Sequence, residues 1–497
     1  MSKKYQNYIN GKWVDAKSGK TFENRNPANW DEVVGTFPLS GKDDVNEAVR
    51  EARTAFESWR LVPAPRRGDI LRKVGDLMTA RKESIARLMT QEMGKVLLET
   101  RGDVQEGIDT AYYAASEGRR LFGHTVPSEL PNKFNMAVRM PVGVAAIITP
   151  WNFPMAIPTW KIFPALVCGN TVVFKPASDT PATATALVEI LAEAGVPPGV
   201  VNIVHGGGSD VGMALVEHPD IDLISFTGST GVGKKISEIA SKTLKRVSLE
   251  LGGKNAQIVM DDARLDLALE GVLWGAFGTT GQRCTATSRL IVHEKVYDKF
   301  LSMVVEKAGK LRLGSGLDEQ VDVGPCVNEN QRKTVDLYVQ IGKSEGAKVV
   351  AGGKVASGNG LSKGWFYEPT VFADVTEQMR VAKEEIFGPV LSVMKVRSLD
   401  EAIRVANNTA YGLSSSVYTQ DINHAYQAIR DLKAGITYIN APTIGAEAHM
   451  PFGGVKETGN GHREGGWTVY DFFTEWKTVY VDYSGKLQRA QIDNAQD

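Results

Sequence analysis

The chain has 497 residues, of which 42% are apolar and 23% charged, as expected for a globular protein of two or three domains. Its 57 lysines and arginines nearly cancel its 58 aspartates and glutamates, so charge favours neither nucleic acid nor an anionic membrane as a partner. The start of the chain lacks a signal-like apolar run, no run is long enough to span a bilayer, and the three cysteines show no close pairing. We therefore expect a cytoplasmic protein.

The first 80 residues predict two amphipathic helices. Apolar residues recur three and four positions apart over 43–59 and again over 70–78, which is typical of helices with one buried face. The stretch 121–141 interrupts the first domain, and we expect it to form an arm.

Beyond residue 142, short apolar runs alternate with helical stretches. Such runs are typical of buried strands in a parallel sheet, and the stretches 181–195 and 231–242 are long enough for crossover helices. The expected strands are 143–150, 170–176, 199–206, 222–228 and 246–253. This alternation predicts a doubly wound, Rossmann-like α/β domain.

A second α/β domain is expected beyond Asn255. Its clearest strands are 256–260, 288–293 and 390–396. The tail 474–483 alternates apolar and polar residues like an edge strand, which can pair with another subunit. The predicted fold class is therefore α/β, with two such domains and a small β arm.

Two sequence features are candidate anion sites. Gly228, Gly231 and Gly233 follow a predicted strand and open a predicted helix, where free backbone N–H groups favour a pyrophosphate. Their spacing differs from the usual dinucleotide fingerprint, so a plain turn is the alternative. Lys175 lies at the carboxyl end of another predicted strand, where ligands bind in such folds. It is otherwise a solvated lysine in a loop.

Cys284 is the candidate nucleophile because its neighbours are polar. Cys168 and Cys326 have the apolar or glycine-proline neighbours of structural thiols. Arg283 precedes Cys284, and its guanidinium can stabilise a thiolate.

Two further residues are candidates for helping such a thiol. Glu250 stands between leucines, where apolar neighbours can raise its pKa into the range of a general base. The alternative is a strand-end carboxylate satisfied by backbone N–H groups. Asn152, in a proline-flanked loop, can donate to an oxyanion, or it is an ordinary turn asparagine.

Six motifs occur in the order seen in the aldehyde dehydrogenase superfamily. They are ITPWNFP with Asn152, FKPAS with Lys175, FTGSTGVG with Gly228 and Ser229, LELGGKN with Glu250, GQRCT with Cys284, and EEIFGPV with Glu385 and Phe387. The resemblance extends from YINGKW near the start to FTEWKTV near the end. It implies a cofactor-binding domain of residues 1–120 and 142–253, a catalytic domain of 254–453, and an oligomerisation arm of 121–141 and 470–497. It also implies a homodimer or homotetramer.

The resemblance implies oxidation of an aldehyde to a carboxylic acid with NAD or NADP. Cys284 would attack the aldehyde carbon, while the amide of Asn152 and the backbone N–H of Cys284 hold the oxyanion. Hydride transfer would leave a thioester, and water activated by Glu250 would hydrolyse it. Lys161 and Glu475 match positions that resemble a proton relay behind Glu250.

The resemblance also implies the cofactor contacts. Ser178 stands where NAD-preferring relatives often carry a glutamate that repels a 2′-phosphate, and Lys175 is near enough in sequence to pair with that phosphate. We therefore expect the protein to accept NADP as well as NAD. Glu385 would hold the nicotinamide ribose, with Phe387 packing nearby. The other expected contacts are Ile148, Thr149, Pro150, Trp151, Gly208, Gly212, Phe226, Thr227, Gly228, Ser229, Val232, Leu251 and Gly252.

The expected substrate residues follow from the same resemblance. Phe153, Trp160 and Phe452 match tunnel-wall positions and would form an aromatic sleeve, with Thr285 beside the thiol; the alternative for aromatic residues is plain core packing. Arg283 and the loop 441–454 resemble the branch that acts on aminoadipate and 2-oxoglutarate semialdehydes. Arg283 would bind a remote carboxylate, or else turn away into an ion pair.

Two other functions remain open at this stage. A semialdehyde dehydrogenase that transfers the acyl group to coenzyme A is disfavoured by Glu250, since related enzymes of that kind commonly lack a carboxylate there. A catalytically inert structural relative is disfavoured by the intact Cys284, Glu250 and Asn152. The seven histidines show no ligand spacing, so no metal site is expected.

Overall fold

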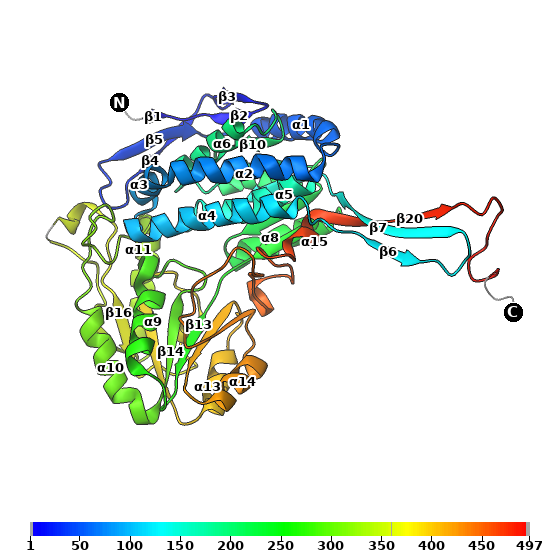
Figure 1. The fold of residues 1–497 in the computed structure, drawn as a ribbon. Helices are drawn as coiled ribbons and strands as arrows, with labels where there is room; N and C mark the ends of the chain where they lie inside the picture. Colours follow the sequence, from blue (N-terminus) through cyan, green and yellow to red (C-terminus); the bar gives the residue numbers. More distant parts are fainter. Residues whose placement is uncertain (1–2, 359, 494–497) are drawn as a thin grey trace.

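The body of the molecule has two lobes, each built on a seven-stranded sheet, and a three-stranded arm projects from it (Figure 1). This is a computed structural model in which residues 3–358 and 360–493 are described. The strand order is β12-β11-β8-β9-β10-β2-β3 in the first lobe and β15-β16-β17-β14-β13-β18-β19 in the second. The fold is therefore α/β, as predicted.

The strand order of the first lobe places the segments that follow β8, β9 and β11 side by side at one end of the sheet. β8 pairs in parallel with β9 on one side and with β11 on the other, so the chain reverses its direction of progress across the sheet at this point. Ligands in such folds bind at the carboxyl ends of the strands beside this reversal. The strands are β2 (Asn7–Ile9), β3 (Lys12–Val14), β8 (Val144–Ile148), β9 (Thr171–Lys175), β10 (Val201–Ile203), β11 (Leu223–Thr227) and β12 (Arg246–Glu250).

Helices cover both faces of the first sheet. One apolar core lies under α2, α4, α5 and α6, and a second lies under α1 and α8. The helices are α1 (Lys42–Trp59), α2 (Ala64–Ala80), α3 (Lys82–Met93), α4 (Leu97–Glu117), α5 (Ala156–Cys168), α6 (Pro181–Ala194), α7 (Met213–Glu217) and α8 (Thr230–Ser241). A small sheet of β1 (Lys3–Lys4), β4 (Thr21–Arg25) and β5 (Val33–Pro38) flanks this lobe.

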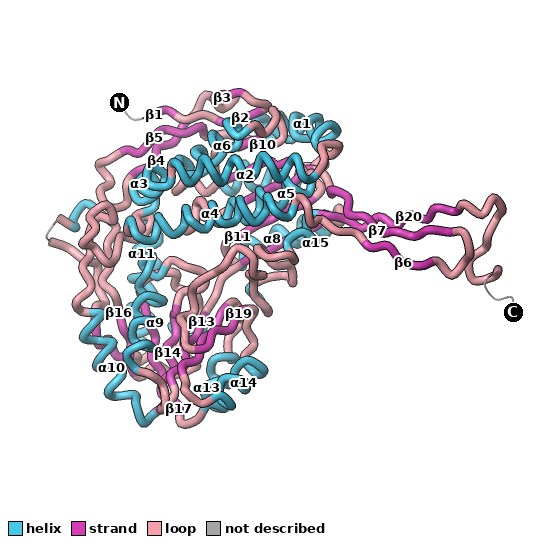
Figure 2. Tube along the Cα trace, viewed as in Figure 1, coloured by secondary structure: helices cyan, strands magenta, loops and turns pink. Residues whose placement is uncertain are grey.

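The second lobe has the same layered plan, with helices on both sides of its strands (Figure 2). Its strands are β13 (Asn255–Val259), β14 (Thr287–His293), β15 (Lys348–Ala351), β16 (Thr370–Ala373), β17 (Val390–Val396), β18 (Ser414–Tyr418) and β19 (Ile436–Ile439). Its helices are α9 (Leu265–Phe277), α10 (Glu294–Ala308), α11 (Glu329–Ser344), α12 (Arg380–Lys383), α13 (Leu399–Asn407) and α14 (Ile422–Asp431).

The arm is an antiparallel sheet made from two distant parts of the chain. β6 (His124–Pro127) and β7 (Lys133–Pro141) form one hairpin, and β20 (Thr474–Asp482) pairs along the whole of β7. Residues 470–473, which we expected in the arm, instead belong to α15 (Val469–Phe473) and pack in the core of the first lobe. Tyr470, Phe472 and Phe473 are large aromatic residues, so their burial against the first lobe is more favourable than exposure on an arm.

All eight strands expected from apolar runs are present, each within three residues of its expected bounds, as are the helices α1, α6 and α8; α2 begins six residues before the expected stretch. The edge strands β3, β15 and β19 were missed, because short strands at a sheet edge lack a continuous apolar run, and the inner strands β2, β16 and β18 were missed as well. No described helix is both long enough and apolar enough to cross a membrane.

Candidate functional site

A cavity of about 420 Å³ lies between the two lobes, with Cys284 in its wall. The first lobe contributes residues of α4, α5 and the end of β12, and the second contributes the loop before β14. The lining residues are Leu98, Glu99, Gly102, Asp103, Glu106, Phe153, Ile157, Trp160, Thr227, Glu250, Leu251, Trp274, Arg283, Cys284, Thr285, Leu413, Gly445, Ala446, Phe452 and Glu464. The cavity therefore brings together Cys284, Glu250 and all five expected substrate residues.

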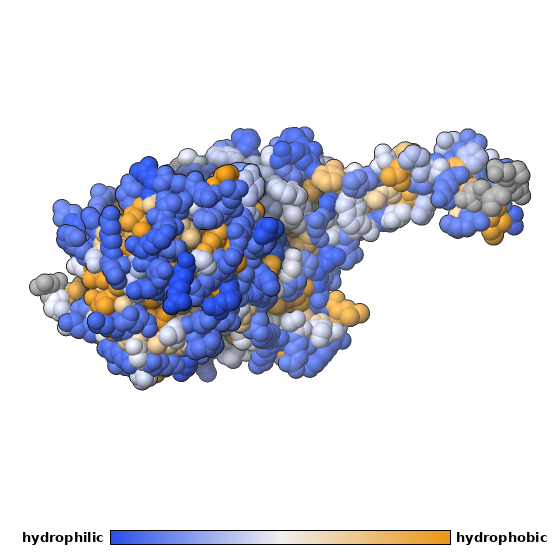
Figure 3. Space-filling model, turned by 90° about the horizontal axis from the view of Figure 1, so that it is seen from below, coloured by the Kyte–Doolittle hydropathy of each residue, from blue (hydrophilic) through white to orange (hydrophobic). Residues whose placement is uncertain are grey.

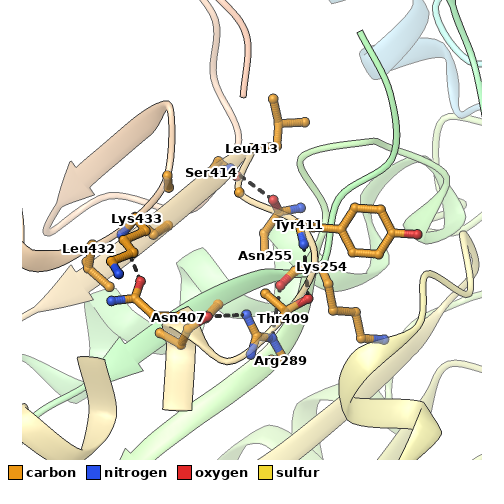
Figure 4. Close-up of a pocket in the computed structure, with 15 residues that line it drawn as sticks. Lys254, Asn255, Arg289, Asn407, Thr409, Tyr411, Leu413, Ser414, Leu432 and Lys433 are labelled. Atoms are coloured by element: carbon orange, nitrogen blue, oxygen red, sulfur yellow. Dashed lines mark hydrogen bonds between the residues drawn. The ribbon is translucent and has the colours of Figure 1, made fainter. Parts of the chain in front are cut away.

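The loop that carries Cys284 is held from behind by Asn255. Its Nδ2 donates to the carbonyls of Cys284 (2.7 Å) and Ala286 (2.9 Å), while its Oδ1 accepts from the backbone N–H of Ser414 (3.0 Å). Figure 4 shows Asn255, at the start of β13, with its hydrogen bond to Ser414 of β18. Gly253 allows this close approach, because a Cβ there would lie 2.3 Å from the Cys284 carbonyl oxygen.

The Cys284 thiol lies in surroundings that favour its neutral form. Burial raises its pKa to about 12, and the carboxyl groups of Glu385 and Glu250 act in the same direction. The guanidinium of Arg283 turns toward Glu99 (3.1 Å) and Thr279 (2.9 Å). The expectation that Arg283 lowers the pKa of this thiol is therefore wrong, and the thiol needs a base to become nucleophilic.

Glu250 lines the same cavity as the thiol and is a candidate for that base. It ends β12, is 2% exposed, and its pKa is raised well above the usual value by burial and then by Glu464. Lys161 and Arg463 act in the opposite direction. An ionised carboxylate whose pKa is raised is a stronger base than an exposed one, so this position suits proton transfer.

Lys161 and Glu464 form a buried ion pair beside Glu250. The Lys161 ammonium donates to Glu464 and to the Ser225 hydroxyl (3.0 Å), and the Thr227 hydroxyl lies 3.4 Å from the same carboxylate. Lys161 is on α5, and Glu464 is held by backbone hydrogen bonds of 2.6 and 2.7 Å with Phe452. Neither carboxyl oxygen of Glu250 has a side-chain hydrogen-bond partner among the described residues, so the ion pair acts on Glu250 through its charges.

The prediction that Glu475 belongs to a proton relay behind Glu250 is wrong. It lies at the start of β20, its side chain is 59% exposed, and it pairs with Arg246 on the surface (3.4 Å). Glu464 occupies the place that was assigned to it. The only sequence signal for Glu464 is its position in a glycine-rich segment after PFGG, which brings the chain back to the first lobe.

Asn152 lies in the loop between β8 and α5, beyond the carboxyl end of β8. It is 2% exposed, and its Oδ1 accepts no hydrogen bond from the described residues. It is not among the residues that line the cavity itself.

The crevice at the carboxyl ends of β8, β9 and β11 contains most of the expected cofactor residues. Gly228 follows β11 and donates to the Glu250 carbonyl (3.0 Å), and Ser229 is the residue before α8, whose first backbone N–H groups face this side. Burial lowers the pKa of Lys175 at the end of β9 to about 8. The hydroxyl of Ser178 donates to the Gly206 carbonyl (3.1 Å).

Glu385 and Phe387 reach the same region from the second lobe. The Glu385 carboxylate accepts from the backbone N–H of Gly253 (2.8 Å), and burial raises its pKa to about 7. The Phe387 ring meets the edge of Trp151 at 5.3 Å between centroids. The remaining expected contacts lie in or beside the β8, β11 and β12 ends or the short helix at 208–212: Ile148, Thr149, Pro150, Gly208, Gly212, Phe226, Thr227, Val232, Leu251 and Gly252.

Aromatic and charged groups share the cavity wall. Trp160 packs on Phe452 with 4.8 Å between ring centroids, and the Lys95 ammonium lies 3.9 Å from the centre of the Phe153 ring. The contribution of α4, which places Glu99, Asp103 and Glu106 on the wall, was not predicted from the sequence. Their spacing of four and three residues was the available signal, because it puts them on one helix face.

This arrangement defines a class of enzyme. A thiol faces a buried carboxyl across a cavity, and beside them lies the crevice of a doubly wound sheet in which dinucleotides bind. No group of three or more possible metal ligands occurs in the part of the chain that the structure describes. The class is that of thiol-dependent oxidoreductases with a dinucleotide-binding domain.

The chain belongs to the aldehyde dehydrogenase family, whose sequence model matches residues 13–479. It is 45% identical over 484 residues to an alpha-ketoglutarate semialdehyde dehydrogenase of Haloferax volcanii, covering 97% of this chain and 100% of that protein. It is 43% identical over 477 residues to an alpha-ketoglutaric semialdehyde dehydrogenase of Bacillus subtilis, covering 96% and 98%. A crystal structure of betaine aldehyde dehydrogenase from Staphylococcus aureus in complex with NAD+ matches at a TM-score of 0.95 and 36% identity, covering 97% and 96%.

Proposed function

We propose that this protein oxidises an aldehyde with a remote carboxylate to the corresponding acid, using NAD or NADP and a covalent intermediate on Cys284. The observation that carries the proposal is the shared cavity of Cys284, Glu250 and Glu464. A thiol, a base and a second proton carrier in one enclosed space are the groups that thioester formation and hydrolysis need.

The first step is proton transfer from Cys284. Because the pKa of the thiol is raised to about 12, little thiolate forms at neutral pH by itself. Glu250 accepts the proton, and the thiolate attacks the aldehyde carbon to give a tetrahedral thiohemiacetal. The Asn152 amide and the Cys284 backbone N–H donate to its oxyanion, which stabilises the tetrahedral state.

The second step is hydrolysis of the Cys284 thioester. The proton that Glu250 took from Cys284 leaves first, toward the carboxylate of Glu464, which adjoins Glu250. The ionised Glu250 then takes a proton from a water molecule, whose hydroxide adds to the thioester carbonyl; the C–S bond breaks, and the Cys284 thiolate that leaves takes back the proton from Glu250. This relay lets a base that is 2% exposed return to its active form.

The crevice of the first lobe fits a nicotinamide dinucleotide. The N-terminal turn of α8 and the glycines before it suit the pyrophosphate, and the Glu385 carboxylate suits ribose hydroxyls. When bound, the nicotinamide ring supplies the hydride acceptor. Ser178 brings no negative charge to the turn after β9, so a 2′-phosphate meets no repulsion from that side chain, which supports use of NADP alongside NAD.

Arg283 supports a carboxylated substrate. It lines the cavity, and although it pairs with Glu99, its Nη1 makes no hydrogen bond with the described residues. That nitrogen can donate to a substrate carboxylate. The ion pair with Glu99 and the expected contact with a substrate carboxylate are therefore compatible. The names of the two relatives from Haloferax volcanii and Bacillus subtilis support a semialdehyde of the 2-oxoglutarate type.

The arm supports assembly into a homodimer or homotetramer. Apolar residues lie along its surface, where Figure 3 shows orange atoms far from the body of the molecule. The exposed fractions are 45% for Phe134, 46% for Trp476, 66% for Tyr480 and 44% for Val481. A second copy of the chain is the partner we propose for this surface. The three free cysteines support a reducing location such as the cytoplasm.

An aldehyde panel tests the proposed function. Aldehydes with and without a terminal carboxylate are assayed with NAD and with NADP, following the absorbance of the reduced cofactor, and the product is identified by mass spectrometry. We expect free acid, faster turnover of carboxylated aldehydes and no turnover by Cys284→Ala. Turnover by that variant would refute the role of the thiol. An acyl-coenzyme A product would indicate the transferase alternative, and a wild-type protein that oxidises no aldehyde would indicate an inert relative.

A further inference from the structure

The side-chain amide of Asn152 makes no hydrogen bond with the described residues, at its oxygen or at its nitrogen. Its direction is therefore set by the backbone that carries it. A donor to an oxyanion works only at a short and well-aligned distance, so a small displacement of this backbone is costly to the reaction. The contacts that fix the loop between β8 and α5 therefore decide where the amide points.

A buried ion pair lies beside this loop. The Lys95 ammonium donates to the Asp103 carboxylate at 2.7 Å, and both side chains are completely shielded from solvent. Lys95 lies in the turn between α3 and α4, and Asp103 lies in the second turn of α4. Each partner makes one further contact, and both contacts fall on the chain that follows Asn152.

Asp103 holds the start of α5. One of its oxygens accepts from Lys95, and the other accepts from the backbone N–H of Ala156 at 2.7 Å. Ala156 is the first residue of α5, and Met155 before it gives the helix no side-chain cap. A carboxylate at a helix N-terminus satisfies a free N–H group and interacts favourably with the helix dipole. Helix α4 therefore supplies the cap that α5 lacks.

Lys95 holds the Phe153 ring. Its Nζ lies 3.9 Å from the ring centre, and this cation–π contact is strengthened because the ammonium is removed from water. Phe153 directly follows Asn152 in the chain. A fixed Phe153 side chain therefore restricts the backbone at the next residue, which is the one that carries the amide.

The surrounding packing makes these contacts rigid. Gly107 lets α4 approach the start of α5, because a Cβ there would lie 3.1 Å from the Met155 side chain. On the other side of the loop, the backbone N–H of Thr149 donates to the Lys175 carbonyl at 3.3 Å. Asn152 is thus carried by a short segment that the sheet fixes before it and the ion pair fixes after it.

We propose that Lys95 and Asp103 are positioning residues, which aim the side-chain amide of Asn152 at the oxyanion by holding the chain that follows it. Both oxygens of Asp103 are occupied by protein groups, so the pair acts through the loop and does not bind the substrate. The inference rests on the proposed function, because Asn152 is the oxyanion donor of that mechanism.

Two reactions of Cys284 separate the position of the amide from the reactivity of the thiol. With 4-nitrophenyl acetate, the sulfur adds to the ester carbonyl to form an oxyanion, and nitrophenolate then leaves an acetyl thioester. With iodoacetamide, the sulfur forms a C–S bond and expels iodide, and no oxyanion arises. In both reactions the thiol loses its proton. The burst of nitrophenolate absorbance gives the acylation rate, and mass spectrometry of the Cys284 peptide gives the alkylation rate.

The test variant combines Lys95→Met with Asp103→Asn. It leaves no buried charge unpaired and keeps an acceptor for the Ala156 N–H, but it removes the cation from the Phe153 ring. We expect acylation to slow about tenfold to a hundredfold, because the amide is displaced, and alkylation to keep its wild-type rate. If circular dichroism shows that this variant does not fold, Lys95→Gln with Asp103→Asn takes its place, since its two amides can still hydrogen-bond to each other.

Asp109→Asn is the matched control, because it removes an exposed carboxylate from the same helix. Both of its rates should equal those of the wild type. A wild-type acylation rate in the Lys95 and Asp103 double variant would overturn the inference. Equal losses of acylation and alkylation would overturn it too, since they would indicate general damage to the site.

Combination with Asn152→Ala tests whether the pair acts through this amide. Asn152→Ala alone should slow acylation about a hundredfold to a thousandfold. Adding the Lys95 and Asp103 substitutions should slow it no further, because residues that act through one group are not additive. A further loss would overturn the inference. An unchanged acylation rate in Asn152→Ala alone would instead contradict the oxyanion role of Asn152 in the proposed function.

Discussion

A thiol whose pKa is raised to about 12 cannot attack a carbonyl carbon at neutral pH until a base removes its proton. The charges around Glu250 set the strength of that base. Glu464 raises the pKa of Glu250, and Lys161 lowers it. The two charges of one salt bridge therefore shift the pKa of the base in opposite directions.

Substitution of each partner should move the pH profile in opposite directions. Glu250 works only when it is deprotonated, so activity rises with pH through its pKa. Glu464→Gln removes the like charge, lowers the pKa of Glu250 and should move the acid limb of kcat/KM to lower pH. Lys161→Met removes the favourable cation and should move that limb to higher pH. Because it also breaks the buried ion pair, it should lower the free energy of unfolding by about 3–5 kcal/mol.

Steady-state kinetics from pH 5 to 9 measures both shifts. Lys310→Met, which removes an exposed lysine just after α10, controls for the change in net charge and should leave the profile in place. Shifts of equal sign in the two variants, or none, would contradict the assignment of Glu250 as the base.

At the scale of an element, the turn from β12 to β13 joins the two lobes and passes between their functional groups. Gly252 and Gly253 let the chain approach Glu385 and the Cys284 loop more closely than any side chain would allow. This turn therefore holds the cofactor crevice and the thiol at a constant separation.

Gly252→Ala should weaken cofactor binding. A Cβ there would lie 2.4 Å from the Glu385 carboxylate, which would have to leave its hydrogen bond with Gly253. We expect the dissociation constant for NAD, measured by quenching of protein fluorescence, to rise about tenfold or more, since a charge-assisted hydrogen bond to ribose is lost. Gly309→Ala, at the end of α10 with no contact under 3.4 Å, is the control. An unchanged dissociation constant in Gly252→Ala would show that Glu385 does not hold the ribose.

At the scale of the whole molecule, the arm and the two lobes have different roles. The lobes enclose the cavity from residues far apart in sequence, while the arm extends away from the cavity and presents apolar groups to solvent (Figure 1). Exposed apolar strands promote pairing with another chain, so the role we propose for the arm is assembly, whereas the cavity is lined by residues of a single subunit.

Charges on the arm should break the assembly without unfolding the lobes. Phe134 and Val481 face each other across β7 and β20, and both are exposed. The double variant Phe134→Asp, Val481→Asp places two like charges on a surface that we expect to be buried between subunits. Light scattering should report the monomer mass, with a circular dichroism spectrum like that of the wild type. An unchanged oligomer mass would place the subunit contact elsewhere.

Much of the fold was predictable because it is encoded locally. The apolar runs of β8, β9 and β11 and the helical spacing of α1 each lie within five to eighteen residues. The polar neighbours of Cys284 and the leucines beside Glu250 were local signals too. They identified two residues that the cavity brings together.

The sequence by itself determined the succession of elements, the two α/β lobes and the family motifs, because periodicity and local composition specify secondary structure. Only the tertiary structure decided which charges meet. Lys161 pairs with Glu464, 303 residues later, and Arg283 pairs with Glu99, 184 residues earlier. Such contacts depend on how two lobes and a returning segment pack, and no local pattern contains that information. The contact between the Lys95 ammonium and the Phe153 ring emerged for the same reason, since it joins two segments that no local pattern connects.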